Sequence, residues 1–170
     1  ILHRAISKGS YEAEKVLETI SPSMDIQIAS NFERLIYDLN NEDDAQTSLD
    51  MKNIKENGKY IINDEKLNKI KENFLSTRMS ENETLETISS VYEKFKVVLD
   101  PHTAIGYGAF DKHDLNGKNI VLGTAHPCKF PDAIHRAIKI KSDLPSEMMF
   151  VLDEKENYDI IENDVEKVKQ

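Results

Sequence analysis

The sequence has little that would cross-link a chain or anchor it in a membrane. It holds no tryptophan and a single cysteine, Cys128, which excludes an internal disulfide framework and a cysteine-rich metal site. Its apolar runs are only a few residues long, as at 120–122, whereas a membrane-spanning helix needs roughly 20 apolar residues. The histidines show no paired ligand spacing, so we predict no metal site.

Positive charge is also scarce. The chain carries 22 Lys and Arg against 31 Asp and Glu, which gives a net charge of −9. Nucleic-acid binding needs clustered basic residues that neutralise phosphates, and here Lys66 and Lys69 stand beside acids such as Glu65. We therefore predict no nucleic-acid partner and no membrane partner. Hydrophobic residues at 39% and charged residues at 31% are typical of a globular chain of about one domain.

The chain begins without methionine, on the apolar-patterned Ile1-Leu2-His3-Arg4, and carries no signal or transit segment. This start predicts the interior of a longer protein, although a processed N-terminus would look the same. The single cysteine predicts a reducing compartment, which we interpret as cytoplasmic.

Hydrophobic periodicity predicts a chain made mostly of helices. Helices are expected near residues 1–8, 11–20, 27–40, 42–57, 64–74, 80–95, 101–112, 131–138 and 163–170. Short strands are expected at 60–62, 96–99, 119–123 and 158–161. The pattern predicts an α/β fold, rich in helix, with a few short parallel strands that are too few for a complete sheet.

Some helix starts are marked by capping residues. Ser80 and Glu83 form a capping box, and Asp100 precedes a proline that suits the first helical position. Gly106 and Gly108 lower helix stability, so their presence in one helix predicts close packing or close backbone approach.

Thr124 follows the apolar segment 119–123, which we interpret as a buried strand. In open α/β sheets ligands bind beyond the carboxyl ends of strands, so Thr124 is a candidate ligand contact. The structural alternative is that Thr124 caps the turn that follows.

His126 and Lys129 stand close to Thr124 in the sequence. Lys129 would supply positive charge to a phosphorylated substrate, and His126 would carry a proton near neutral pH. The alternatives are a solvated lysine and a turn histidine bonded to the backbone. Cys128 is interpreted as a small packing residue, because no base partner is evident.

Asp100, His102 and Thr103 lie at another predicted strand-to-helix junction. A helix start offers unpaired amide donors to anions, which makes these residues candidates for the substrate side of a site. Asp100 also has a purely structural interpretation as the helix cap.

Three strings carry a resemblance to a known family. Residues 21–34 read Ser-Pro-Ser-Met-Asp-Ile-Gln-Ile-Ala-Ser-Asn-Phe-Glu-Arg, residues 100–106 read Asp-Pro-His-Thr-Ala-Ile-Gly, and residues 123–131 read Gly-Thr-Ala-His-Pro-Cys-Lys-Phe-Pro. They closely resemble the C-terminal part of threonine synthase, a pyridoxal-phosphate enzyme of the tryptophan-synthase-β-like superfamily. Caps and local ion pairs explain single positions in 21–34, but not the whole string.

The resemblance implies that residues 1–170 are a C-terminal segment of a fold type II enzyme, an incomplete cofactor-binding domain. It implies that Thr124 meets the pyridine nitrogen of pyridoxal 5'-phosphate, where a neutral hydroxyl does not force that nitrogen to stay protonated. The Schiff-base lysine and the phosphate loop would lie upstream of Ile1, so no catalytic residue is expected in this segment. Gly123 and Cys128 depart from the family, which usually has small residues such as alanine there.

The implied reaction converts O-phospho-L-homoserine and water to L-threonine and phosphate, and the isolated segment is expected to be inactive. The alternatives are a related pyridoxal-phosphate lyase or dehydratase, and a non-catalytic binding module derived from the same fold. Inside a larger enzyme, segment 119–123 would be buried on both faces. Without the missing N-terminal part, the chain is expected to expose an apolar patch there or to self-associate and cover it.

Overall fold

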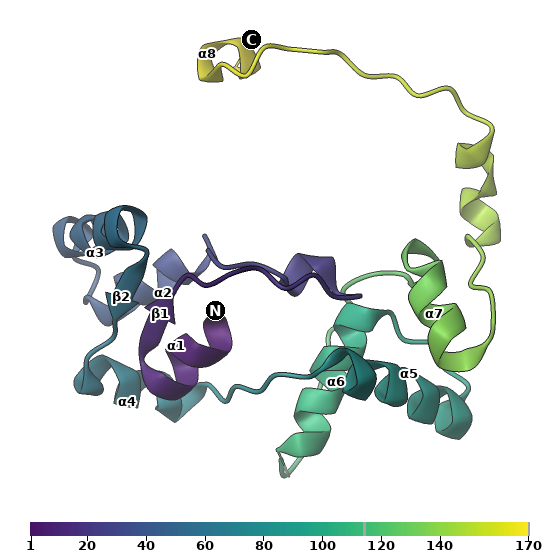
Figure 1. Ribbon diagram of the computed structural model, residues 1–170, viewed down its shortest axis with the longest axis horizontal. Helices are drawn as coiled ribbons and strands as arrows, with labels where there is room; N and C mark the ends of the chain where they lie inside the picture. The colour runs from purple at the N-terminus through teal and green to yellow at the C-terminus, as the bar shows by residue number, and fades with distance from the viewer. Residues whose placement is uncertain (114, 170) are drawn as a thin grey trace.

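The computed structural model describes residues 1–113 and 115–169, which form two lobes and an extended tail (Figure 1). The N-terminal lobe comprises residues 1–73 and the helical lobe residues 81–138, and the two lie side by side. The tail, residues 140–169, leaves the helical lobe and arches back above the two lobes in the view of Figure 1.

The N-terminal lobe folds around one apolar core. Its elements in chain order are α1 (Leu2–Lys8), β1 (Ser10–Glu12), α2 (Phe32–Leu39), α3 (Asp44–Asn57), β2 (Lys59–Ile61) and α4 (Asp64–Asn73). Ile36 and Ile70 are at most 1% exposed in this core. The rings of Tyr11 and Phe32 stack with centroids 5.2 Å apart. The apolar stripe predicted for 27–40 is therefore the buried face of α2.

The sheet differs from the prediction of parallel strands. Among the described residues, only β1 and β2 pair, and they do so antiparallel with Tyr11 opposite Tyr60. The segment predicted as a helix over 11–20 instead begins with β1 and continues without regular structure. The strand predicted at 60–62 is confirmed as β2, which begins and ends one residue earlier.

The strands predicted at 96–99, 119–123 and 158–161 are wrong for the chain as described, because all three segments are irregular. A strand needs a neighbour to satisfy its N–H and C=O groups, and this part of the chain offers none. Residues 119–123 are also largely exposed, with Ile120 at 89% and Leu122 at 74%.

The helical lobe consists of α5 (Glu81–Phe95), α6 (Pro101–Lys112) and α7 (Pro131–Ile138), with η2 (Pro127–Lys129) before α7. Helix α5 packs against both α6 and α7. The shared core is small and consists of Ile88, Ala104 and Ile134, each fully buried. This lobe carries two of the three strings that resemble the family.

Local signals in the sequence predict the helix starts of this lobe well. The capping box of Ser80 and Glu83 is confirmed at the start of α5. Asp100 caps α6, and Pro101 occupies its first turn. The close packing predicted for glycine is confirmed at Gly108, where an added Cβ would collide with the Met79 side chain.

The tail has little regular structure. It contains η3 (Ser146–Leu152) and the short α8 (Val165–Val168), with exposed side chains throughout most of its length. The helix predicted over 163–170 is thus confirmed only as α8, and residue 170 lies outside the described residues.

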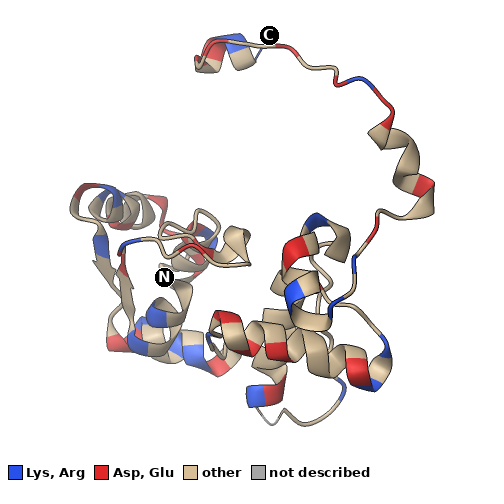
Figure 2. Cartoon of the chain, turned by 45° about the vertical axis from the view of Figure 1, so that its right-hand side comes forward, with Lys and Arg blue, Asp and Glu red and all other residues tan. Residues whose placement is uncertain are grey.

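Figure 2 shows Lys and Arg interspersed with Asp and Glu along both lobes and the tail. None of the helices in the described part of the chain has the length and apolar character needed to cross a membrane.

Candidate functional site

The three strings meet at the N-terminus of α6. Asp100 is 1% exposed, and its Oδ1 accepts hydrogen bonds from the backbone N–H groups of His102 at 2.9 Å and Thr103 at 3.4 Å. The structural interpretation of Asp100 as the cap of α6 is therefore confirmed. The cap also fixes the first turn of the helix, from which His102 and Thr103 project.

His102 links this turn to the other two strings. Its Nδ1 lies 3.2 Å from Asp100 Oδ1, and its Nε2 accepts the backbone N–H of Ser23 at 3.3 Å. An Nε2 that accepts a hydrogen bond carries no proton, so Nδ1 holds the proton and donates it to Asp100. The ring also packs on Phe130, with centroids 4.9 Å apart.

Thr103 connects the same turn to Thr124. Its hydroxyl donates to Asp100 Oδ2 and accepts the backbone N–H of Thr124 at 3.0 Å. The two threonine hydroxyl oxygens lie 3.4 Å apart. Three residues predicted as site candidates, Asp100, Thr103 and Thr124, thus form one chain of hydrogen bonds.

A cleft of about 400 Å³ opens beside Thr124. It is lined by residues of α6 and of the irregular segment after it, together with Met24 of η1 (Pro22–Met24) and Leu75; the main side chains are His102, Ala109, Phe110, His113, Leu115, Asn119, Val121 and Leu122. Among the described residues no carboxylate lines this cleft. The wall is therefore mostly apolar, with a few polar groups and no acidic side chain from the part of the chain that the structure describes.

The location predicted for Thr124 needs a correction. It does not follow a strand, because residues 119–123 are irregular, and its side chain is exposed at the edge of the cleft. The cause is the same lack of a neighbouring strand that leaves 119–123 unpaired. Thr124 nevertheless has a fixed backbone position, which comes from Thr103 rather than from a sheet.

His126 and Lys129 lie outside the cleft. The Nδ1 of His126 accepts the backbone N–H of Cys128 at 3.2 Å, which makes His126 the cap of η2. Lys129 lines a separate pocket of about 270 Å³, together with Phe130 and Pro22. The structure therefore groups Lys129 with the first string rather than with Thr124.

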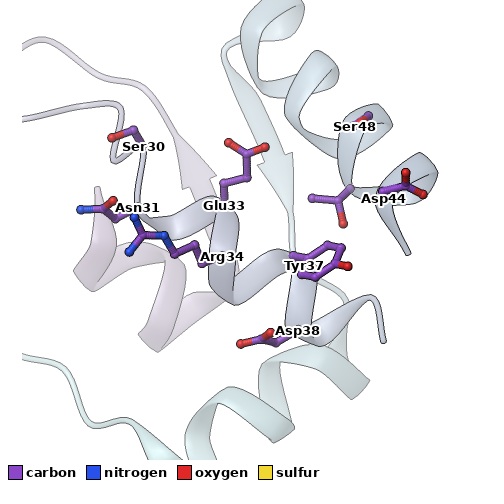
Figure 3. A pocket seen from close by; sticks show the side chains of 9 residues that line it. Ser30, Asn31, Glu33, Arg34, Tyr37, Asp38, Asp44 and Ser48 are labelled. Atoms are coloured by element: carbon purple, nitrogen blue, oxygen red, sulfur yellow. The ribbon is translucent and has the colours of Figure 1, made fainter. Parts of the chain in front are cut away.

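The string 21–34 divides into parts with different surroundings. Its start reaches the helical lobe through Ser23, whereas Phe32 enters the core of the N-terminal lobe. Four polar residues, Ser30, Asn31, Glu33 and Arg34, line a third pocket of about 690 Å³ beside α3 (Figure 3). Arg34 makes no ion pair with any described residue.

Known proteins are similar to this chain in both sequence and fold. The family described as threonine synthase, C-terminal, matches residues 103–170. Threonine synthase of Pseudomonas aeruginosa is 36% identical over 99% of this chain and 37% of its own length. That of Saccharomyces cerevisiae is 37% identical over 99% of this chain and 38% of its own length.

Solved structures give the same result. The structure described as PLP-bound threonine synthase from Brucella melitensis has a TM-score of 0.85 and 38% identity, over 99% of this chain and 36% of that one. Yeast threonine synthase has a TM-score of 0.82 and 36% identity. This chain is therefore similar to threonine synthases in both sequence and structure. It spans a little over a third of the length of the threonine synthases it matches and resembles their C-terminal part.

Two contacts of the candidate site escaped the sequence-based prediction. The backbone of Ser23 contacts His102 across 79 positions, and Phe130 packs on the same ring. Phe130 lies just before Pro131, which opens α7, so its apolar side chain at a helix start was the signal that could have found it. No local pattern signals the contact of Ser23, because a backbone donor depends only on the path of the chain.

Proposed function

We propose that this chain is the C-terminal part of a pyridoxal-phosphate-dependent threonine synthase and forms one wall of its active site. The whole enzyme would convert O-phospho-L-homoserine and water to L-threonine and phosphate. The observation that carries the proposal is the meeting of three family strings at the start of α6, through Ser23, His102 and Thr124. Residues 1–170 would then be an incomplete cofactor-binding domain.

The residues around the cleft fit pyridoxal phosphate. An aromatic ring needs a largely apolar cleft with a few placed polar groups, and the cleft beside Thr124 has this character. Nε2 of His113, on the same wall, is buried without a hydrogen-bond partner among the described residues, so polar capacity remains for a ligand. The match to a PLP-bound threonine synthase from Brucella melitensis supports the same ligand.

Thr124 would face the pyridine nitrogen. When bound, pyridoxal phosphate supplies an electron-withdrawing ring that stabilises negative charge on the substrate. A threonine hydroxyl can donate or accept a hydrogen bond and carries no charge, so it holds the ring without forcing the nitrogen to be protonated. Since no carboxylate lines the described cleft, this neutral contact would dominate at that edge of the ring.

His126 and Lys129 would act on the substrate side. Nδ1 of His126 accepts from the backbone, so its proton sits on Nε2 and is available for donation. Lys129 is exposed and forms no ion pair with the described residues, which leaves its charge available to a phosphate. Asp100, His102 and Thr103 would hold the geometry of the wall.

The remaining parts of the proposal concern what surrounds the chain. The N-terminal part of the same protein would be its partner and would supply the lysine that binds the cofactor. No lysine among the described residues lines the cleft beside Thr124, which supports a lysine from elsewhere. We place the enzyme in the cytoplasm on the strength of its single cysteine.

The test is release of threonine and phosphate from O-phospho-L-homoserine by the longer protein that contains this chain. Thr124→Val is expected to lower kcat about 10²-fold, because a placed hydrogen-bonding group is lost, whereas Thr124→Ser should retain most activity. Thr84→Val is the control for the loss of a threonine hydroxyl, since Thr84 is a hydrogen-bonded threonine of the same lobe that lies outside the site. Thr84 is buried whereas Thr124 is exposed, so its substitution should lower stability rather than kcat.

Other outcomes would identify the alternatives. Deamination of an amino acid to a keto acid without threonine formation would indicate a dehydratase. Cofactor or ligand binding with no turnover of any substrate would indicate a binding module. Equal activity of Thr124→Val and the wild type would remove Thr124 from the site.

A further inference from the structure

Thr103 is the best-anchored hydroxyl of the site, although it does not line the cleft. It is 7% exposed and forms hydrogen bonds with the Asp100 carboxylate and the Thr124 backbone. Nothing in the capping of α6 requires this side chain, because Asp100 caps the helix through backbone N–H groups. The side chain therefore serves contacts beyond the helix start.

The direction of each hydrogen bond follows from the number of protons available. A threonine hydroxyl has one proton and two lone pairs. The carboxylate of Asp100 can only accept a hydrogen bond, so the hydroxyl of Thr103 donates its proton into the hydrogen bond with Asp100. One lone pair of Thr103 then accepts the N–H of Thr124, and the second faces the Thr124 hydroxyl at 3.4 Å.

This arrangement allows the Thr124 hydroxyl two hydrogen-bonding orientations. Its hydroxyl can donate to the free lone pair of Thr103 and accept from a ligand, or it can turn and donate to the ligand. The hydrogen bond between Thr103 and Asp100 cannot reverse its direction, because the buried carboxylate of Asp100 has no proton to donate. The backbone of Thr124 stays fixed in both orientations.

We propose that Thr103 is a positioning residue for Thr124: oriented by Asp100, it fixes the backbone of the cofactor contact and keeps an acceptor beside its hydroxyl. The role toward the cofactor rests on the proposed function, whereas the hydrogen-bond chain itself does not. Thr103 would not touch the cofactor, and its effect would pass entirely through Thr124.

The first experiment measures amide exchange in the 170-residue chain by NMR. Thr103→Val removes all hydrogen bonds of the hydroxyl, to Asp100 and to the backbone and side chain of Thr124, and keeps the side-chain volume. The exchange of the Thr124 amide is expected to rise about five- to tenfold, as the loss of one hydrogen bond allows, while the Ala104 amide inside α6 stays protected. Thr103→Ser restores the hydroxyl and should restore the slow exchange.

The second experiment measures cofactor affinity in the longer protein by absorption and fluorescence titration with pyridoxal phosphate. Thr103→Val is expected to weaken binding about tenfold and to shift the absorption maximum of the bound cofactor, and Thr103→Ser should recover both. Thr84→Val, which removes a comparable buried hydroxyl from α5, should lower stability without changing either property.

The outcomes separate the inference from the proposed function. A wild-type protein that binds no pyridoxal phosphate overturns the proposed function and the role of Thr103 toward the cofactor. Slow Thr124 exchange that depends on Thr103 would still confirm the hydrogen-bond chain. Thr103→Val with wild-type Thr124 exchange, or with the same cofactor affinity as Thr84→Val, overturns the inference.

Discussion

The two lobes differ in the size of their apolar cores and in the apolar side chains that they expose near the candidate site. Among the described residues, the core cluster of the N-terminal lobe contains nine buried apolar side chains, and that of the helical lobe contains three. The N-terminal lobe also buries a polar network. The helical lobe likewise buries the hydrogen-bonded Asp100, His102 and Thr103, but it exposes apolar residues beside them, such as Ile120 and Leu122.

The polar network of the N-terminal lobe centres on Asp50, which is 5% exposed. Its carboxylate accepts hydrogen bonds from Gln46 at 2.9 Å, Asn40 at 3.1 Å and Tyr60 at 3.1 Å, and Lys66 lies 3.8 Å away. Burial raises the pKa of Tyr60 above its usual value, and the adjacent carboxylate raises it further. A buried charge with this many partners stabilises one arrangement of the lobe.

The comparison indicates that the helical lobe, rather than the N-terminal lobe, lacks packing and pairing neighbours near the candidate site within the described part of the chain. The N-terminal lobe pairs its two short strands and has the larger apolar core of the two lobes. The helical lobe carries the site, and the segment that leads to Thr124 lacks the neighbours that would make it a strand. A site wall with an uncovered apolar face agrees with a chain that spans about a third of its relatives.

The largest expected effect comes from the two cores. Ile36 and Ile134 are both fully buried, one in each lobe. Ile36→Ala is expected to lower the free energy of unfolding of the N-terminal lobe by about 2–5 kcal/mol, because it leaves a cavity. Amide exchange in α5 should change little, since the lobes have separate cores. Ile134→Ala should loosen α5 and spare α4.

Amide exchange measured by NMR in both variants tests whether each substitution destabilises only its own lobe. If each substitution accelerates exchange equally in both lobes, the chain unfolds as one cooperative unit, and the contrast between the lobes fails.

The next effect concerns the polar network. Lys66→Met removes the cation near Asp50 and is expected to cost about 1–3 kcal/mol, because the buried carboxylate loses part of its compensation. Lys69→Met is the matched control: it lies on the same helix, and its pair with Glu65 is exposed, so the cost should stay below about 0.5 kcal/mol. Urea unfolding followed by circular dichroism compares the two, and equal costs would mean that the network does not stabilise the lobe.

The same contrast explains what could be predicted from the sequence. Helices that begin at their own capping residues, such as α5 at Ser80 and α6 at Asp100, depend on local hydrogen bonds and were predicted correctly. The strand predicted over 119–123 would need hydrogen-bonding neighbours, which the described residues do not offer, so its apolar run led to a wrong prediction. Tyr11 was assigned to a helix, because its pairing with Tyr60 is invisible locally.

The hydrogen bonds of the candidate site also divide into local ones, which the sequence predicts, and long-range ones, which it does not. The hydrogen bonds from Asp100 to the first turn of α6 span two or three residues, and the sequence predicts them. The bonds from Thr103 to Thr124 and from Ser23 to His102 span 21 and 79 positions. No local pattern in the sequence indicates either contact, because each one depends on the path of the chain between residues far apart.

A smaller effect on stability is expected at the uncovered segment. Replacing Ile120 and Leu122 together by serine should change the free energy of unfolding by no more than about 0.5 kcal/mol, because both side chains are already exposed. Binding of an apolar-surface dye, or self-association measured by light scattering, should fall clearly. Leu49→Ser, at an isolated exposed position of the N-terminal lobe, should change neither. Unchanged dye binding and mass in the double variant would show that 119–123 is not the exposed patch.

The smallest effect is a pH dependence at the start of α5. A hydrogen bond from Lys112, at 2.7 Å, and further bonds from Ser80 lower the pKa of Glu83 from 4.5 to about 2. A folded-state pKa below the unfolded value adds stability that is complete above pH 4.5 and is lost as the pH falls toward 2. The contribution is small, because the ion pair lies on the surface, where solvent screens it.

Carboxyl chemical shifts measured by NMR against pH test this directly. Lys112→Met should move the pKa of Glu83 upward, toward 4.5, while the capping box with Ser80 keeps it somewhat low. Lys139→Met, on the lysine that directly follows α7 and bonds only a backbone carbonyl among the described residues, should leave the Glu83 titration unchanged. A Glu83 that titrates at its ordinary pKa in the wild type would show that Lys112 does not hold α6 to the start of α5 in solution. The helical lobe would then be joined mainly by its small apolar core, and its contrast with the N-terminal lobe would be sharper still.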